Sequence, residues 1–88
     1  MKIKYEKKAI KFLAKTEKAL VNNIKKAISG LTENPPQGDI KTLDGYKDGR
    51  KRLRYGKYRI IFRYTETEDA IKILLIMNIG SRGDIYSH

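Results

Sequence analysis

The sequence contains no cysteine and only one histidine, His88, among its 88 residues. Without cysteine there is no disulfide framework, no thiolate metal site and no thiol nucleophile. The lone histidine and the scattered Asp and Glu do not form a cluster with metal-ligand spacing, so we expect neither a metal ion nor another cofactor. The missing disulfides are compatible with a reducing compartment, and we expect a cytoplasmic protein.

Long hydrophobic runs and acidic residues are also scarce. The longest apolar run, residues 73–77, has five residues, whereas a membrane-spanning helix needs about 20. The lysines near the N-terminus are not followed by an apolar stretch, so we expect no signal peptide. Ten acidic residues stand against 20 Lys and Arg, for a net charge of +10. This charge excludes an acidic metal-buffering protein and favours an anionic partner.

The first half of the sequence predicts a strand followed by a helical hairpin. Polar and apolar residues alternate over 2–5, as in a short strand. Apolar residues then recur at helical spacing, first over 6–15 and again after Thr16, which we expect to cap the second helix. Asn34-Pro35-Pro36 ends that helix, because the proline ring cannot continue it.

The next segment, residues 37–49, is expected to be an irregular loop punctuated by glycines. Three of its side chains can attach it to the core: Ile40, Leu43 and Tyr46. Residues 50–55 and 58–64 alternate as strands on either side of Gly56-Lys57, which predicts a β-hairpin.

The remaining residues predict a third strand of the same meander. Residues 65–69 are a polar turn, and 70–79 are apolar on both faces, as expected for a strand inside the sheet. Residues 80–83 are expected to be a loop, and 84–86 a short final strand. Residues 1–88 therefore form a single α+β domain, in which an N-terminal strand and a helical hairpin pack on a mostly antiparallel sheet.

Residues 50–64 hold seven Lys or Arg and no acid. Strand alternation places Leu53, Ile60 and Phe62 toward the helices, together with Lys51. Five arginines then share the open face of the sheet: Arg50, Arg52, Arg54, Arg59 and Arg63. A guanidinium fork binds two phosphate oxygens at once, so this face favours an anionic ligand, although solvent and salt also screen like charges. Charge alone leaves RNA, DNA and an acidic protein open as ligands.

Three residues near the C-terminus are further candidates. His88 is either idle at a frayed terminus or an acid–base group near neutral pH. Tyr86 is either a packed residue or a ring that stacks on a base. Arg82, in a glycine-flanked loop, is either solvated or directed at a ligand. The surrounding residues 80–83 lack the length and the Gly-Lys-Ser/Thr end of a phosphate-binding P-loop.

Three motifs together resemble the RelE/ParE toxin superfamily, and the order of the expected elements resembles it too. The motifs are Leu43-Asp44-Gly45, Arg52-Leu53-Arg54-Tyr55-Gly56-Lys57-Tyr58-Arg59-Ile60-Ile61-Phe62 and Ile79-Gly80-Ser81-Arg82-Gly83-Asp84-Ile85-Tyr86. The resemblance covers essentially the whole chain and implies a RelE-like, microbial-RNase-like fold. It further implies the toxin of a toxin–antitoxin system: an mRNA interferase, that is, a metal-independent endoribonuclease that cleaves mRNA in the ribosomal A site by 2′-hydroxyl attack.

The resemblance also implies roles for individual residues. Arg59 matches the sheet arginine that contacts the scissile phosphate. Arg82 matches the loop arginine that stabilises charge or assists the leaving oxygen. Tyr86 matches the aromatic residue that stacks on a base. Arg52 completes the expected catalytic group. The expected RNA-binding residues are Arg50, Arg54, Lys51, Lys57, Arg63 and His88.

One departure from the family pattern affects the general base. Arg50 and Arg52 stand where RelE-like enzymes often carry lysines. A lysine among cations can act as a base, but arginine stays protonated in proteins. The base is then Lys51, Lys57 or His88, or the 2′-hydroxyl is deprotonated with electrostatic help alone.

The resemblance implies three partners: a cognate antitoxin that is acidic and partly disordered, the ribosome and mRNA. Two alternatives stay open. A ParE-like toxin poisons DNA gyrase and is not a nuclease; the pair Arg82 and Tyr86 favours the nuclease, because gyrase-poisoning members generally lack it. A passive nucleic-acid-binding module would tolerate single Arg→Ala changes, since its phosphate contacts share the binding energy.

Overall fold

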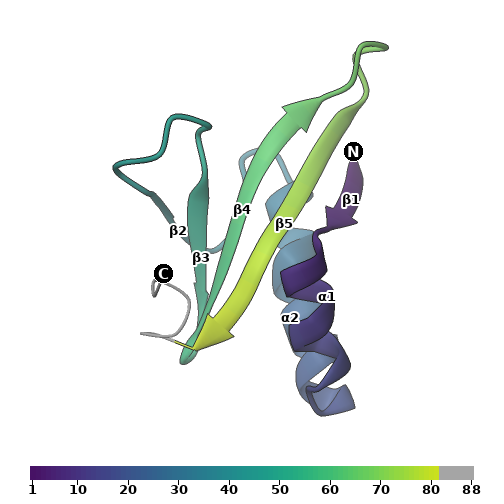
Figure 1. The fold of residues 1–88 in the computed structure, drawn as a ribbon, viewed down its shortest axis with the longest axis vertical. Coiled ribbons are helices and arrows are strands. Elements are labelled where there is room, and N and C mark those ends of the chain that lie inside the picture. Colours follow the sequence, from purple (N-terminus) through teal and green to yellow (C-terminus); the bar gives the residue numbers. More distant parts are fainter. Residues whose placement is uncertain (82–88) are drawn as a thin grey trace.

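Two helices pack on one face of a five-stranded sheet (Figure 1) in this structure, a computed structural model that describes residues 1–81. The elements in chain order are β1 (Lys2–Tyr5), α1 (Lys7–Ala14), α2 (Lys18–Ser29), the 3₁₀ helix η1 (Gly30–Thr32), β2 (Asp39–Thr42), β3 (Lys51–Tyr55), β4 (Tyr58–Glu66) and β5 (Lys72–Ser81). Among these residues no helix is long and apolar enough to cross a membrane.

The strand order in the sheet is β1-β5-β4-β3-β2. The β2–β3, β3–β4 and β4–β5 pairs are antiparallel, and β1 joins the far edge parallel to β5. The α+β class, the helical hairpin and the mostly antiparallel sheet predicted from the sequence are therefore confirmed. Strand β5 lies inside the sheet, as its apolar faces predicted, and β4 is the central strand.

The helices begin and end close to their predicted limits, with one correction at Thr16. The Thr16 hydroxyl donates a hydrogen bond of 2.6 Å to the carbonyl oxygen of Phe12, so it closes the end of α1. Glu17 occupies the N-cap position of α2 without a side-chain hydrogen bond. The prediction that Thr16 caps α2 was wrong, because a threonine hydroxyl can bond back to the carbonyl four residues earlier.

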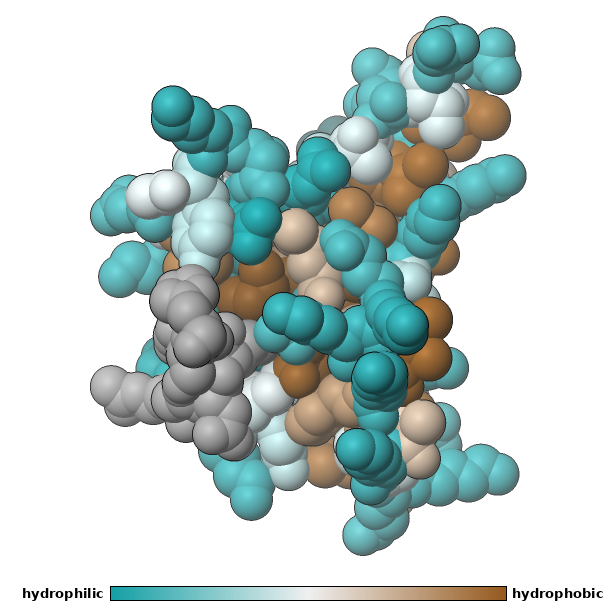
Figure 2. Space-filling view, in the orientation of Figure 1, coloured by the Kyte–Doolittle hydropathy of each residue, from teal (hydrophilic) through white to brown (hydrophobic). Residues whose placement is uncertain are grey.

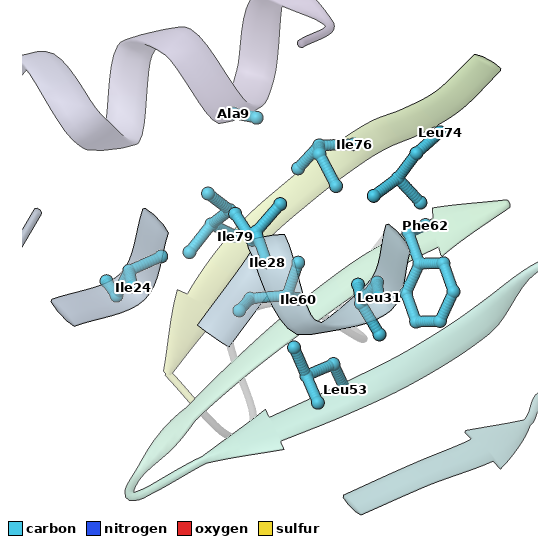
Figure 3. Close-up of a cluster of buried hydrophobic side chains, with 10 residues drawn as sticks. All are labelled: Ala9, Ile24, Ile28, Leu31, Leu53, Ile60, Phe62, Leu74, Ile76 and Ile79. Atoms are coloured by element: carbon cyan, nitrogen blue, oxygen red, sulfur yellow. The ribbon is translucent and has the colours of Figure 1, made fainter. Parts of the chain in front are cut away.

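The core lies between the helical hairpin and the inner face of the sheet (Figure 3). Ile28 of α2 and Leu31 of η1 lie over Ile60 and Phe62 of β4, and all four side chains are fully buried. The Tyr64 hydroxyl donates a hydrogen bond of 2.7 Å to the Leu31 carbonyl oxygen and ties the end of the helical hairpin to β4. The helices therefore cover one face of the sheet and leave the other face for the arginines.

Strand β5 contains a bulge at Met77. The register between β4 and β5 shifts between Ile61 and Phe62, which leaves Met77 without a partner on β4. The extra residue changes the side on which later residues point, so Ile76 and Ile79 are both buried in the core. The bulge thereby decides which β5 residues lie on the arginine face.

The predicted loop over residues 37–49 is partly wrong. Asp39–Thr42 form the edge strand β2, which pairs antiparallel with β3. Ile40 packs against the core as expected, but Tyr46 is 39% exposed and does not attach the segment to it. A four-residue strand with one apolar side chain gives too short an alternation to be recognised in the sequence.

The last two strands are longer at their C-terminal ends than predicted. Strand β4 continues to Glu66. Strand β5 begins at Lys72 and continues through Gly80 to Ser81, residues that were expected to start a loop. The short final strand expected over 84–86 lies outside the described residues.

Gly38 lies directly before the edge strand β2, where the backbone passes close to a core side chain. Gly38 has a φ of 124°, and a Cβ there would lie 2.6 Å from Cδ1 of the buried Leu53. At Gly45, with a φ of 85°, a Cβ would meet nothing within 4 Å. We expect Gly38→Ala to lower the free energy of unfolding by about 2 kcal/mol and Gly45→Ala by about 1 kcal/mol, from backbone strain alone. Urea denaturation measures both, and equal losses would contradict the close packing of Gly38 on Leu53.

Candidate anion-binding site

The open face of the sheet carries the arginines in rows that run across the strands. In one row Arg54 of β3 faces Arg59 of β4. The row consists of Asp39, Arg54, Arg59 and Gly80, and the next row of Lys41, Arg52, Ile61 and Asn78. Like charges directly opposite each other on neighbouring strands repel. The predicted grouping of Arg52, Arg54 and Arg59 on one face is confirmed by this register.

These rows line an open pocket with a volume of about 380 Å³. Its lining residues come from β2, the following loop, β3 and β4: Lys41, Thr42, Leu43, Asp44, Arg52, Arg54 and Arg59. Four of these side chains are cationic and one is acidic. Lys41 and Asp44 were not among the sequence-predicted site residues, because only the pairing of β2 with β3 brings Lys41 opposite Arg52.

Arg59 is the buried cation of the pocket, with 8% of its surface exposed. One of its terminal nitrogens donates a hydrogen bond of 3.3 Å to the Tyr58 carbonyl oxygen. Among residues 1–81 no carboxylate lies within ion-pair distance of Arg59, although a guanidinium has five N–H donors. Gly80 faces Arg59 from β5 and adds no side chain to the row. A buried, unneutralised guanidinium stabilises whatever oxyanion reaches it.

Arg52 and Arg54 share one carboxylate, that of Asp39. Arg54 Nε lies 2.6 Å from Asp39 Oδ2, and a terminal nitrogen of Arg52 lies 3.8 Å from Oδ1. Residues 50–64 hold no acid, and the counter-charge for these two arginines comes instead from β2. The acid is distant in sequence, and the β2–β3 pairing places it beside Arg54. Both Arg54 and Asp39 are about half exposed, and an exposed ion pair contributes roughly 0–1 kcal/mol.

Arg50 and Arg63 form a second group around Asp48, and neither lines the pocket. Arg50 donates through Nε and a terminal nitrogen to the two Asp48 oxygens, at 3.2 and 2.8 Å. These bonds lower the pKa of Asp48 and raise the pKa of Arg50. Arg63 Nε lies 3.9 Å from Asp48 Oδ2 and is buried without a hydrogen bond. The five arginines expected to form one patch are thus divided into two groups.

The other predicted site residues lie away from the pocket or outside the described residues. Lys51 pairs with Phe62 on the helix-covered face, and its Nζ lies 3.5 Å from the Gly49 carbonyl oxygen. Lys57 lies in the β3–β4 turn, with Nζ 5.5 Å from the Tyr58 ring centre. The predictions for Arg82, Tyr86 and His88 concern residues beyond 81. Within residues 1–81 no three His, Asp or Glu side chains come together to hold a metal ion.

Comparisons with known proteins identify relatives of this chain. The family model described as "ParE toxin of type II toxin-antitoxin system, parDE" matches residues 3–86. A search of curated proteins gives no match. The RelB-RelE antitoxin-toxin complex from Methanococcus jannaschii contains a similar chain, with a TM-score of 0.66 and 23% identity over 94% of both chains.

Two other solved structures have the same fold. One belongs to the toxin-antitoxin complex RelBE2 from Mycobacterium tuberculosis, with a TM-score of 0.68, 18% identity, and 92% of this chain and 96% of that chain covered. The other is the isolated RelE toxin of E. coli, with a TM-score of 0.66, 18% identity, and coverage of 97% and 89%. The helical hairpin and the sheet that carries the arginine rows are thus a recurring arrangement.

The Asp39 carboxylate competes with any anion that enters the pocket, because it pairs with two of the lining arginines. We expect Asp39→Asn to tighten the binding of tripolyphosphate about threefold, which corresponds to the loss of one exposed ion pair. Isothermal titration calorimetry at low salt measures the dissociation constant.

The matched control is Asp69→Asn, which removes the same charge from the turn between β4 and β5. It makes the same change in net charge, so we expect it to change the dissociation constant less than Asp39→Asn. If both variants tighten binding equally, net charge and not the local ion pair sets the affinity.

Proposed function

We propose that this chain, which belongs to the ParE family of toxins of type II toxin–antitoxin systems within the RelE/ParE superfamily, is a ribosome-dependent endoribonuclease. Its substrate is mRNA in the ribosomal A site, and its reaction needs no metal ion or other cofactor. The observation that carries the proposal is Arg59, a buried guanidinium without a carboxylate partner in residues 1–81, on the wall of an open cationic pocket. A phosphodiester supplies the oxyanion that this geometry stabilises.

The proposed reaction is a transesterification within the RNA chain. The 2′-oxygen attacks the adjacent phosphorus and loses its proton to a base, while the bond from phosphorus to the 5′-oxygen breaks and that oxygen gains a proton. The products are a cyclic phosphate and a 5′-hydroxyl. Negative charge grows on the non-bridging oxygens as the fifth bond forms. Arg59 donates to those oxygens from a fixed position, which stabilises the transition state more than the ground state.

We assign the other roles in this reaction to the remaining residues of the pocket. Arg52, which is mostly buried, holds the scissile phosphate from the neighbouring row, and Arg54 exchanges Asp39 for a phosphate oxygen at the rim. Among the described lining residues Asp44 is the carboxylate and is our candidate for the proton acceptor, while Lys41 adds a further positive charge. From the resemblance, Arg82 assists the leaving oxygen and Tyr86 stacks on a base.

The same proposal includes a protein partner. Solved relatives of this fold include RelB-RelE and RelBE complexes of toxin with antitoxin. With a net charge of +10, this chain favours an acidic antitoxin that covers the arginine face in the cytoplasm, and the complex weakens as salt rises.

Gyrase poisoning is the second candidate function. The family model that matches is that of ParE, and arginines stand at positions 50 and 52, where RelE-like enzymes often carry lysines. A ParE-type toxin would use the arginine face to bind protein and would leave RNA intact. Inhibition of DNA supercoiling by purified gyrase, together with intact mRNA on ribosomes, is the result that favours this candidate.

Arg59→Ala tests the nuclease. We expect the variant to lower the rate of A-site cleavage on stalled ribosomes about 100-fold, because it removes a preorganised donor to the phosphate oxygens. Primer extension locates and quantifies the breaks. Arg59→Lys keeps the charge without the planar fork and should recover only a small part of the rate.

Arg63→Ala is the matched control, because Arg63 lies on the same strand and sheet face but pairs with Asp48 outside the pocket. We expect it to retain cleavage within about fivefold of the wild type, since it loses only a partly exposed ion pair. Thermal unfolding checks that both variants fold. Full cleavage by a folded Arg59→Ala variant would refute the role given to Arg59.

A further inference from the structure

An exposed tyrosine belongs to the loop that also contributes to the lining of the cationic pocket. Tyr46 belongs to the loop of residues 43–50 between β2 and β3, and 39% of its surface is exposed. This loop lies on one side of the molecule and the two helices on the other (Figure 1), and hydrophilic surface gathers over it (Figure 2). Leu43 and Asp44 of the same loop line the pocket. Tyr46 follows the pocket-lining Asp44 by two residues, so their Cα atoms lie within about 7 Å of each other.

The ring is fixed in place by a stack of side chains. The Arg50 guanidinium carbon lies 4.1 Å from the centre of the Tyr46 ring. Asp48 holds that guanidinium by two hydrogen bonds and also accepts one from the Arg50 backbone N–H. Arg63 approaches Asp48 from β4, and the Leu43 N–H donates to the Arg50 carbonyl oxygen across the base of the loop. The loop thus presents an aromatic ring at low entropic cost.

A purely structural role explains the stack less well than a binding role. A cation–π contact at an exposed site contributes roughly 0.5–1 kcal/mol, and the ion pair with Asp48 already holds Arg50. Arg50 therefore does not need the ring to hold it, and 39% of the Tyr46 surface stays in contact with water. An exposed aromatic next to a cationic groove is the arrangement with which proteins bind the bases of single-stranded nucleic acid.

We propose that Tyr46, supported by Arg50, is a stacking platform for one base of single-stranded RNA, next to the nucleotide whose phosphate lies in the pocket. The platform rests on the proposed function, because it assumes that the pocket binds RNA. It adds a contact to a base, whereas the pocket arginines contact phosphate. Stacking discriminates weakly between bases, since every base has a π face.

The test compares two RNA probes of equal length and charge: a short adenosine oligonucleotide and the same sugar-phosphate chain without bases. Fluorescence anisotropy at low salt gives the dissociation constants. We expect Tyr46→Leu to weaken binding of the adenosine probe about tenfold and to leave the abasic probe unchanged. Tyr46→Phe keeps the ring and should bind both probes like the wild type. The salt dependence should be equal for all three proteins, because the phosphate contacts remain.

Three results would overturn the platform. If Tyr46→Leu weakens the binding of both probes equally, the ring supports only the loop. If it weakens the binding of neither probe, the ring does not contribute to RNA binding. Absence of any binding to either probe by the wild type would also overturn it. The cleavage assay with Arg59→Ala is read separately: a base-dependent effect of Tyr46→Leu without A-site cleavage would retain the platform and refute the nuclease.

Discussion

The repulsion among arginines at the fixed spacing of a β-sheet is the constraint on which the site depends. Arg54 and Arg59 face each other on neighbouring strands, and a sheet cannot move them apart. The chain compensates with carboxylates from a neighbouring segment: Asp39 beside Arg54, and Asp48 beside Arg50. Arg59 has no such partner among residues 1–81. Arg59, the buried cation of the described residues, is thus left for a ligand, while its neighbours are partly neutralised at the surface.

The hydrophobic core makes this arrangement rigid. Side chains of α2 and η1 cover Ile60 and Phe62 on the inner face of β4, the strand that carries Arg59 on its outer face. The bulge at Met77 sets the register that places Gly80 opposite Arg59, so β5 adds no side chain to that row. Packing on the inner face of the sheet therefore fixes the strand that carries Arg59 on the outer face. In the proposed reaction, a preorganised donor of this kind acts without having to reorganise.

Alternation and helical spacing were sufficient to predict the helical hairpin, the sheet and the arginine face, because side-chain direction along a strand has a fixed period of two. The missed features depend on contacts between distant residues. Strand β2 has only Ile40 as an apolar signal, and the pairing of Asp39 with Arg54 exists only once β2 lies beside β3. Asp48 is close to Arg50 in the chain, but its approach to Arg63 depends on β4. Strand β5 is apolar on both faces near Met77, so its sequence carries no alternation that could reveal a bulge.

The parallel pairing of β1 with β5 determines the stage of synthesis at which this toxin can acquire its folded site. Lys2 pairs with Ile73, so the first strand finds its place only after nearly all of the described chain has been synthesised. The surroundings of Arg59 are also incomplete until β5, which supplies Gly80, has been synthesised. Contacts between such distant residues form late, because closing a long loop costs entropy before any contact repays it. A nascent chain of this toxin thus lacks its assembled site until β5 has been translated, and under the proposed function this order of folding protects the ribosome that makes it.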